Sequence, residues 1–66
     1  MNRIRELRER HKMTQDELAG HMGLTGPSVA KWELGKSNPT AENLKRLADI
    51  FDCSIDYILG REGASA

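Results

Sequence analysis

Residues 14–35 read TQDELAGHMGLTGPSVAKWELG, and this stretch contains the start and stop signals of two short helices. Thr14 followed three residues later by Glu17 forms a capping box, in which the hydroxyl accepts from an early backbone amide and the carboxylate accepts from the amide of Thr14. Gly23 follows the last apolar position of the repeat, where a left-handed residue commonly ends a helix. The pattern predicts a first helix that starts at Thr14 and ends before Gly23.

A second helix is predicted directly after this one. Thr25 is a suitable N-cap residue, and Pro27 stands in the first turn, where a missing amide donor costs nothing. Val29 and Trp32 are three residues apart and are expected to point toward the core, and Gly35 ends the helix. The opposite face is expected to offer to solvent Gly26, Pro27, Ser28 and Lys31.

The link between the two helices consists of Gly23 and Leu24. Such a short link forces the helix axes to cross steeply, and Ala19 is small enough to let the backbones approach at the crossing. This arrangement is a helix-turn-helix. Its second helix stands out from the domain and can enter a DNA major groove, which is about 12 Å wide.

The rest of the chain is predicted to be helical as well. Apolar residues recur at three- and four-residue steps and do not alternate with polar ones, so no strand is expected. Thr40 and Ser54 are N-cap residues for two further helices. We expect an all-α, five-helix fold in one domain over residues 1–60, followed by a flexible tail at 61–66. The helices are predicted at about residues 2–12, 14–22, 25–35, 40–51 and 54–60.

The composition is that of an ordinary globular domain. Ten Lys and Arg residues balance ten Asp and Glu residues, so the formal net charge is zero, although residues 1–36 carry about +2 and the remainder about −2. Cys53 is the single cysteine and can form no internal disulfide, which favours a reducing compartment. The apolar runs are too short for a membrane span or a signal peptide. These features predict a cytoplasmic protein.

A series of short motifs runs along the chain in a defined order. They are Thr14-Gln15-x-x-Leu18-Ala19, Gly23-Leu24-Thr25, Lys31-Trp32-Glu33-x-Gly35-Lys36, Pro39, Leu44 and the run from Cys53 to Gly60. Together they resemble the helix-turn-helix domains of the lambdoid phage repressors and Cro proteins, the Xre-like family. The resemblance covers about nine-tenths of the chain. It implies a five-helix, lambda-repressor-like domain that binds operator DNA, usually as a two-fold dimer on a palindromic site.

The resemblance also implies roles for individual residues. Gln15 is similar to a glutamine that contacts a phosphate and braces the second helix of the motif. Arg8 and Glu33 resemble a buried ion pair that ties the first helix to the end of the third. Phosphate contacts are expected from Thr14, Gln15, Thr25, Lys36, Ser37 and Asn38.

At the positions that read bases, the sequence departs from the family pattern. Family members commonly carry long amides or other polar side chains at the two positions after the cap, whereas this chain has Gly26 and Pro27. Ser28 can bond several bases, Lys31 can reach guanine O6 or N7, and Pro27 can contact a thymine methyl group. Direct readout is therefore expected to be sparse, with Lys31 as the first candidate and DNA shape adding discrimination.

The last predicted helix is unusually apolar for its length. Ile55, Tyr57 and Ile58 lie within four residues and present more apolar surface than one small core is expected to cover. We therefore expect these three residues to form the interface of a homodimer.

The predicted function is that of a sequence-specific, double-stranded-DNA-binding transcriptional regulator of the repressor type. An antitoxin or a restriction–modification controller would use the same fold. A protein-binding adaptor is a third alternative, motivated by Gly26, Pro27 and the zero net charge. No catalytic set with a cleft is evident, so an enzyme is not expected. His11 and His21 lack partners at metal-ligand spacing, and no metal, cofactor or small-molecule substrate is predicted.

Overall fold

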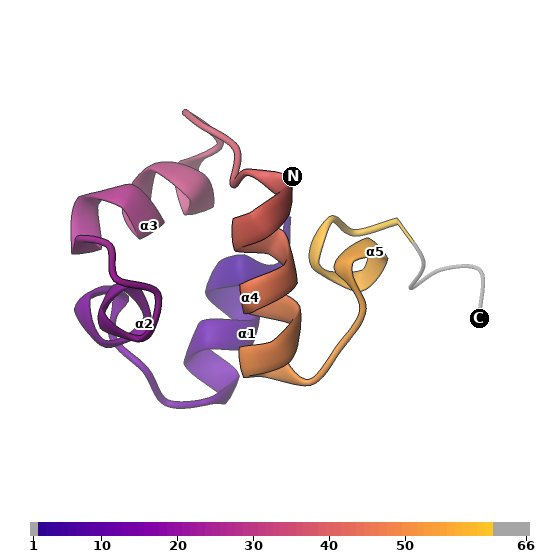
Figure 1. Cartoon of the computed structure of the whole chain (residues 1–66), viewed down its shortest axis with the longest axis horizontal. Coiled ribbons are helices and arrows are strands. Elements are labelled where there is room, and N and C mark those ends of the chain that lie inside the picture. Colours follow the sequence, from indigo (N-terminus) through magenta and orange to yellow (C-terminus); the bar gives the residue numbers. More distant parts are fainter. Residues whose placement is uncertain (1, 62–66) are drawn as a thin grey trace.

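The computed structural model describes residues 2–61 and consists of five α-helices joined by short turns (Figure 1). No strand occurs within these residues, and the predicted all-α fold is confirmed. Each helix is shorter than its predicted range, because the predicted ranges include the capping residues and, for the first and last helices, also residues beyond the caps. The tail predicted at 61–66 lies, beyond Arg61, outside the described residues. The helices are α1 (Ile4–Arg10), α2 (Gln15–His21), α3 (Gly26–Leu34), α4 (Ala41–Phe51) and α5 (Ile55–Ile58).

The helices are arranged around α4 and α1 (Figure 1). α2 and α3 lie together on one side of α4, and α5 lies on the other side. α1 joins the same core, since its Leu7 and the Phe51 side chain of α4 belong to one buried cluster. The α2–α3 pair is consequently carried on one side of the molecule, away from α5.

Side-chain caps start three of the helices as predicted. The Thr14 hydroxyl accepts from the Glu17 amide, and the Glu17 carboxylate accepts from the Thr14 amide, which completes the capping box. The Thr40 and Ser54 hydroxyls cap α4 and α5 in the same way. Thr25 is the exception, because its side chain makes no capping hydrogen bond. Its hydroxyl oxygen lies instead 3.4 Å from that of Ser28.

Helix ends were only partly predictable. Gly23 (φ 69°) and Gly35 (φ 75°) adopt the left-handed conformation expected of them. Lys12 (φ 57°) and Asp52 (φ 54°) adopt it as well, although neither is glycine. Residues other than glycine, asparagine and aspartate adopt the left-handed conformation only at a steric cost. α1 therefore ends at Arg10, before the Lys12 reversal.

The core fixes the orientation of α3. Val29 is completely buried and Trp32 is 5% exposed, so both point inward as predicted. They pack with the side chain of Met22, which follows α2, and with side chains from the other four helices, which are Ile4, Leu7, Leu18, Ala19, Leu47, Phe51 and Ile58.

A buried ion pair adds a second constraint on α3. The Arg8 Nε atom donates to Glu33 Oε2 at 2.7 Å, and the two side chains are 11% and 5% exposed. A second nitrogen of Arg8 donates to the Met13 carbonyl at 2.7 Å. The hydrogen bonds that Arg8 donates to Glu33 raise the pKa of Arg8, although desolvation of the guanidinium acts in the opposite direction. This pair, which the resemblance implied, connects α1 with the last turn of α3 and is confirmed.

Replacing Trp32 with alanine is expected to remove most of the stability of the fold. A large aromatic-to-alanine change in a core costs about 3–5 kcal/mol, and a domain of this size has little more than that to lose. Leu34→Ala on the same helix is the matched control, since Leu34 is exposed and should change the free energy of unfolding by less than about 0.5 kcal/mol. Urea unfolding followed by circular dichroism measures both. A small loss for Trp32→Ala would contradict the anchoring role.

The ion pair is expected to behave as a unit. Arg8→Met leaves a buried carboxylate without its partner and should cost about 3–5 kcal/mol, whereas Arg8→Met combined with Glu33→Leu should cost less than that single change. The exposed pair of Arg5 and Glu9 is the control, where Arg5→Met should cost about 0.5 kcal/mol or less. A double-mutant cycle of unfolding free energies tests this, and strictly additive effects would refute it.

Candidate nucleic-acid interface

The outward face of α3 lies opposite its two core anchors. Pro27 and Lys31 are exposed there, as predicted, and Ser28 is half-buried beside them. Leu34 was not predicted to lie on this face. It is 69% exposed and is, among the described residues, the only large apolar side chain that lies mostly in solvent. Its spacing of three residues from Lys31 was the signal that could have placed it here.

Gly26 does not belong to the exposed face, contrary to the prediction. Gly26 is buried and lies against α2. A Cβ atom at this position would collide with the Asp16 carboxylate and would lie 3.8 Å from the Asp16 Cα atom. Ala19 is buried, as expected, and at Gly26 the Asp16 side chain of α2 lies against the start of α3. The missing side chain thus leaves room for the Asp16 carboxylate at the start of α3.

Gln15 links the start of α2 to the end of α3. Its Nε2 atom donates to Glu33 Oε1 at 3.1 Å, on the carboxylate that also binds Arg8. This hydrogen bond is the brace that the resemblance implied. The phosphate contact of Gln15 stays a prediction.

A hollow beside α3 brings together several of the predicted contact residues. It has a volume of about 340 Å³. Four segments surround it, which are the turn between α2 and α3, α3 itself, the loop that follows α3 and the start of α4. Asn43, which lines it from the first turn of α4, was missed by sequence reasoning, although a polar residue three positions after the Thr40 cap is a usable signal. The lining residues are Leu24, Ser28, Lys31, Trp32, Ser37, Asn38, Thr40 and Asn43.

The remaining predicted residues lie outside this hollow. Thr14 and Thr25 are exposed at the starts of α2 and α3, and Lys36 is exposed in the loop after α3. The Thr14 hydroxyl is already engaged in the capping box, so it has less capacity for a further partner.

Ion pairing leaves two lysines available near this surface. Arg5, Arg10 and Arg46 are each paired with a glutamate one helical turn away, at 3.2, 2.8 and 2.9 Å. Among residues 2–61, no ion pair involves Lys31 or Lys36. Both lysines are exposed, so their charges can meet an anionic partner.

The predicted dimer residues differ in exposure. Ile58 is completely buried in the core, so the prediction that it forms an interface is wrong. The reason is that α5 packs against the start of α1, where the Arg3 amide donates to the Ile58 carbonyl at 2.8 Å. Ile55 and Tyr57 are half-buried. The Arg3 guanidinium lies 4.2 Å from the centre of the Tyr57 ring and covers part of it.

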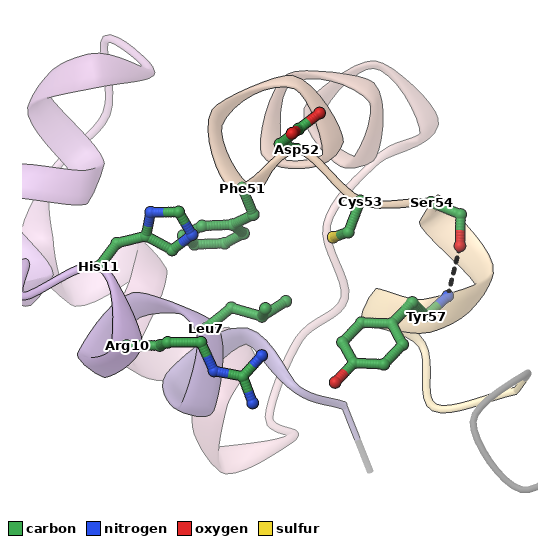
Figure 2. A pocket seen from close by; sticks show the side chains of 8 residues that line it. All are labelled: Leu7, Arg10, His11, Phe51, Asp52, Cys53, Ser54 and Tyr57. Carbon is green, nitrogen blue, oxygen red and sulfur yellow. Dashed lines mark hydrogen bonds between the residues drawn. The ribbon is translucent and has the colours of Figure 1, made fainter.

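Tyr57 also borders a second hollow, between α1 and the α4–α5 turn (Figure 2). This hollow has a volume of about 400 Å³. The His11 and Phe51 rings lie on one side, with their centroids 5.3 Å apart, and the Tyr57 ring faces the hollow from α5 (Figure 2). The surface around Tyr57 is therefore concave and partly aromatic.

The described residues form neither a membrane-spanning helix nor a cluster of metal ligands. None of their helices is long and apolar enough to cross a membrane. In the same part of the chain, no group of three His, Cys, Asp or Glu side chains is placed to hold a metal ion.

Comparisons with known proteins agree with this geometry. A family model described as helix-turn-helix matches residues 4–58. The uncharacterized HTH-type transcriptional regulator YobD of Bacillus subtilis (strain 168) is 40% identical over 58 residues, covering 88% of this chain and 52% of YobD. The HTH-type transcriptional regulator DicA of Escherichia coli (strain K12) is 42% identical over 57 residues, covering 86% of this chain and 42% of DicA. The chain thus spans about half the length of these curated relatives, or less.

A solved structure extends the similarity to three dimensions. The crystal structure of the P22 c2 repressor in complex with synthetic operator 9T aligns with this chain at a TM-score of 0.84 and 33% identity, covering 91% of each chain. The five-helix arrangement predicted from the resemblance is therefore confirmed. With most of its length matched in sequence and in structure, this chain belongs to the helix-turn-helix family of the phage-repressor type.

Proposed function

We propose that this chain binds double-stranded DNA in a sequence-specific manner and regulates transcription as a repressor. The observation that carries the proposal is the placement of α3, whose inward face is locked by Trp32 and Glu33 while Lys31 points outward. An exposed helix held this rigidly can lie in a major groove. The operator in the P22 c2 complex and the regulator relatives support the same function. The role is that of a binding module and not of an enzyme.

Base reading and phosphate binding fall to different residues in this proposal. Lys31 reads guanine O6 or N7, Ser28 bonds a neighbouring base and Pro27 contacts a thymine methyl group. The loop after α3 and the starts of α2 and α3 bind phosphates, which sets affinity and register without reading sequence. The phosphate contacts come from Thr14, Gln15, Thr25, Lys36, Ser37 and Asn38.

We further propose that the chain acts as a homodimer on a palindromic operator. The dimer surface consists of Ile55, Tyr57 and the hollow beside Tyr57, without the buried Ile58. The helix that carries Ile55 and Tyr57, α5, lies on the side of α4 away from α3, so pairing through α5 would leave both α3 helices free (Figure 1). Two-fold symmetry would place them about 34–36 Å apart, which is one turn of DNA.

A protein-binding adaptor is the second candidate function. The exposed Leu34, on the same outward face of α3 as Pro27, favours it, because an apolar outward face on α3 also suits a protein partner. Salt dependence separates the two candidates. DNA binding should lose affinity with a log–log slope of about −0.9 for each phosphate neutralised, which an adaptor without phosphate contacts should not show.

Lysine substitutions test the proposed division of roles. Lys31→Ala should weaken binding by about 1–3 kcal/mol on sites that carry the preferred base and relax the preference at that position. Lys36→Ala should weaken binding to all DNA sequences alike. It should also reduce the slope of log affinity against log salt concentration by the amount that corresponds to about one phosphate. Lys45→Ala, on the exposed face of α4, is the control. Fluorescence anisotropy on duplexes selected from a random pool measures these effects, and an equal loss on all sequences for Lys31→Ala would make it a phosphate contact.

Sedimentation measures the proposed dimer. Analytical ultracentrifugation of the chain with a palindromic duplex should show two protein chains per duplex, because each half-site takes one α3 helix. A duplex that carries a single half-site is the control and should bind more weakly. A strict monomer both with and without the palindrome would contradict the dimer.

A further inference from the structure

The Asp16 carboxylate occupies the space where a side chain of residue 26 would begin. Asp16 belongs to the first turn of α2, and Gly26 is the first residue of α3. Because Gly26 has no Cβ atom, the carboxylate can lie directly against its backbone. A side chain of α2 is thereby brought to the leading end of α3.

That leading end has few polar side-chain groups of its own. Gly26 and Pro27 can neither donate nor accept through their side chains. The Thr25 and Ser28 hydroxyl oxygens lie 3.4 Å apart and share a hydrogen bond. The carboxylate beside Gly26 is therefore the one charged acceptor contributed by residues 14–28 at this point of the described structure.

Asp16 also differs from several of the glutamates in the chain. Glu6, Glu9 and Glu42 are paired with arginines, and Glu17 is engaged in the capping box. Asp16 is exposed, and no hydrogen bond or ion pair joins its side chain to another residue within 2–61. The carboxylate is thus available to an outside donor.

We propose that Asp16 is a specificity-determining residue that accepts a hydrogen bond from the exocyclic amino group of a cytosine. This assignment rests on the proposed insertion of α3 into the major groove. A carboxylate only accepts hydrogen bonds, and cytosine N4 offers a donor in that groove. Guanine offers only acceptors there, thymine offers an acceptor and a methyl group, and the amino group of adenine stands next to the N7 acceptor. Asp16 therefore selects cytosine and rejects guanine at one position of each half-site.

Substitutions that keep or remove the polar group test this assignment. The wild-type chain first selects a consensus from a random duplex pool. Dissociation constants for the consensus and its single-base variants are then measured by fluorescence anisotropy at one salt concentration. The variants are Asp16→Ala and Asp16→Asn, and the control is Asp49→Asn, which makes the same charge change at an exposed position near the end of α4. Thermal unfolding verifies that each variant is folded.

The expected result is a change of preference at one base position. Asp16→Ala should reduce the preference for cytosine there by roughly fivefold or more, and Asp16→Asn should shift it toward adenine, with which asparagine forms a bidentate pair. Asp49→Asn should leave all preferences unchanged. If both Asp16 variants bind every sequence more tightly by one common factor, Asp16 only repels phosphate and the assignment is overturned. An unchanged consensus also overturns it, whereas a wild-type chain that selects no duplex refutes the proposed function itself.

Discussion

The buried ion pair between Arg8 and Glu33 is the interaction on which the functional surface depends. Three helices meet at one carboxylate, because Glu33 on α3 binds Arg8 of α1 and accepts from Gln15 of α2. A carboxylate with 5% of its side chain exposed is stable there only while these donors remain in place. The helix-turn-helix is therefore held against α1 by an ion pair, and removing only one partner of that pair strongly destabilises the fold.

This constraint separates the two faces of α3. The inward face packs through Val29 and Trp32, and the ion pair prevents the last turn from rotating. What remains outward is a short, sparsely polar face in which Lys31 is the single charged residue. A face with so few polar groups gains from a neighbouring helix that supplies another, and the close contact of Gly26 with α2 allows Asp16 to do so.

The zero net charge describes this surface poorly. Several arginines are neutralised by glutamates one helical turn away, and such pairs add little stability but cancel the field they would otherwise produce. Lys31 and Lys36 are left outside every ion pair within residues 2–61. The position of unpaired charge is thus more informative about an anionic partner than the overall count.

The sequence by itself determined the features that arise between residues three or four positions apart. The Thr14 capping box and the left-handed Gly23 follow from local backbone geometry, so the helices and the motif could be predicted. The burial of Ile58 and the contact of Gly26 with Asp16 were decided only by the tertiary structure. Both features depend on which helix lies opposite. Ile58 is covered by residues that are distant in the chain, and the space left by the missing side chain of Gly26 is occupied by Asp16 of another helix.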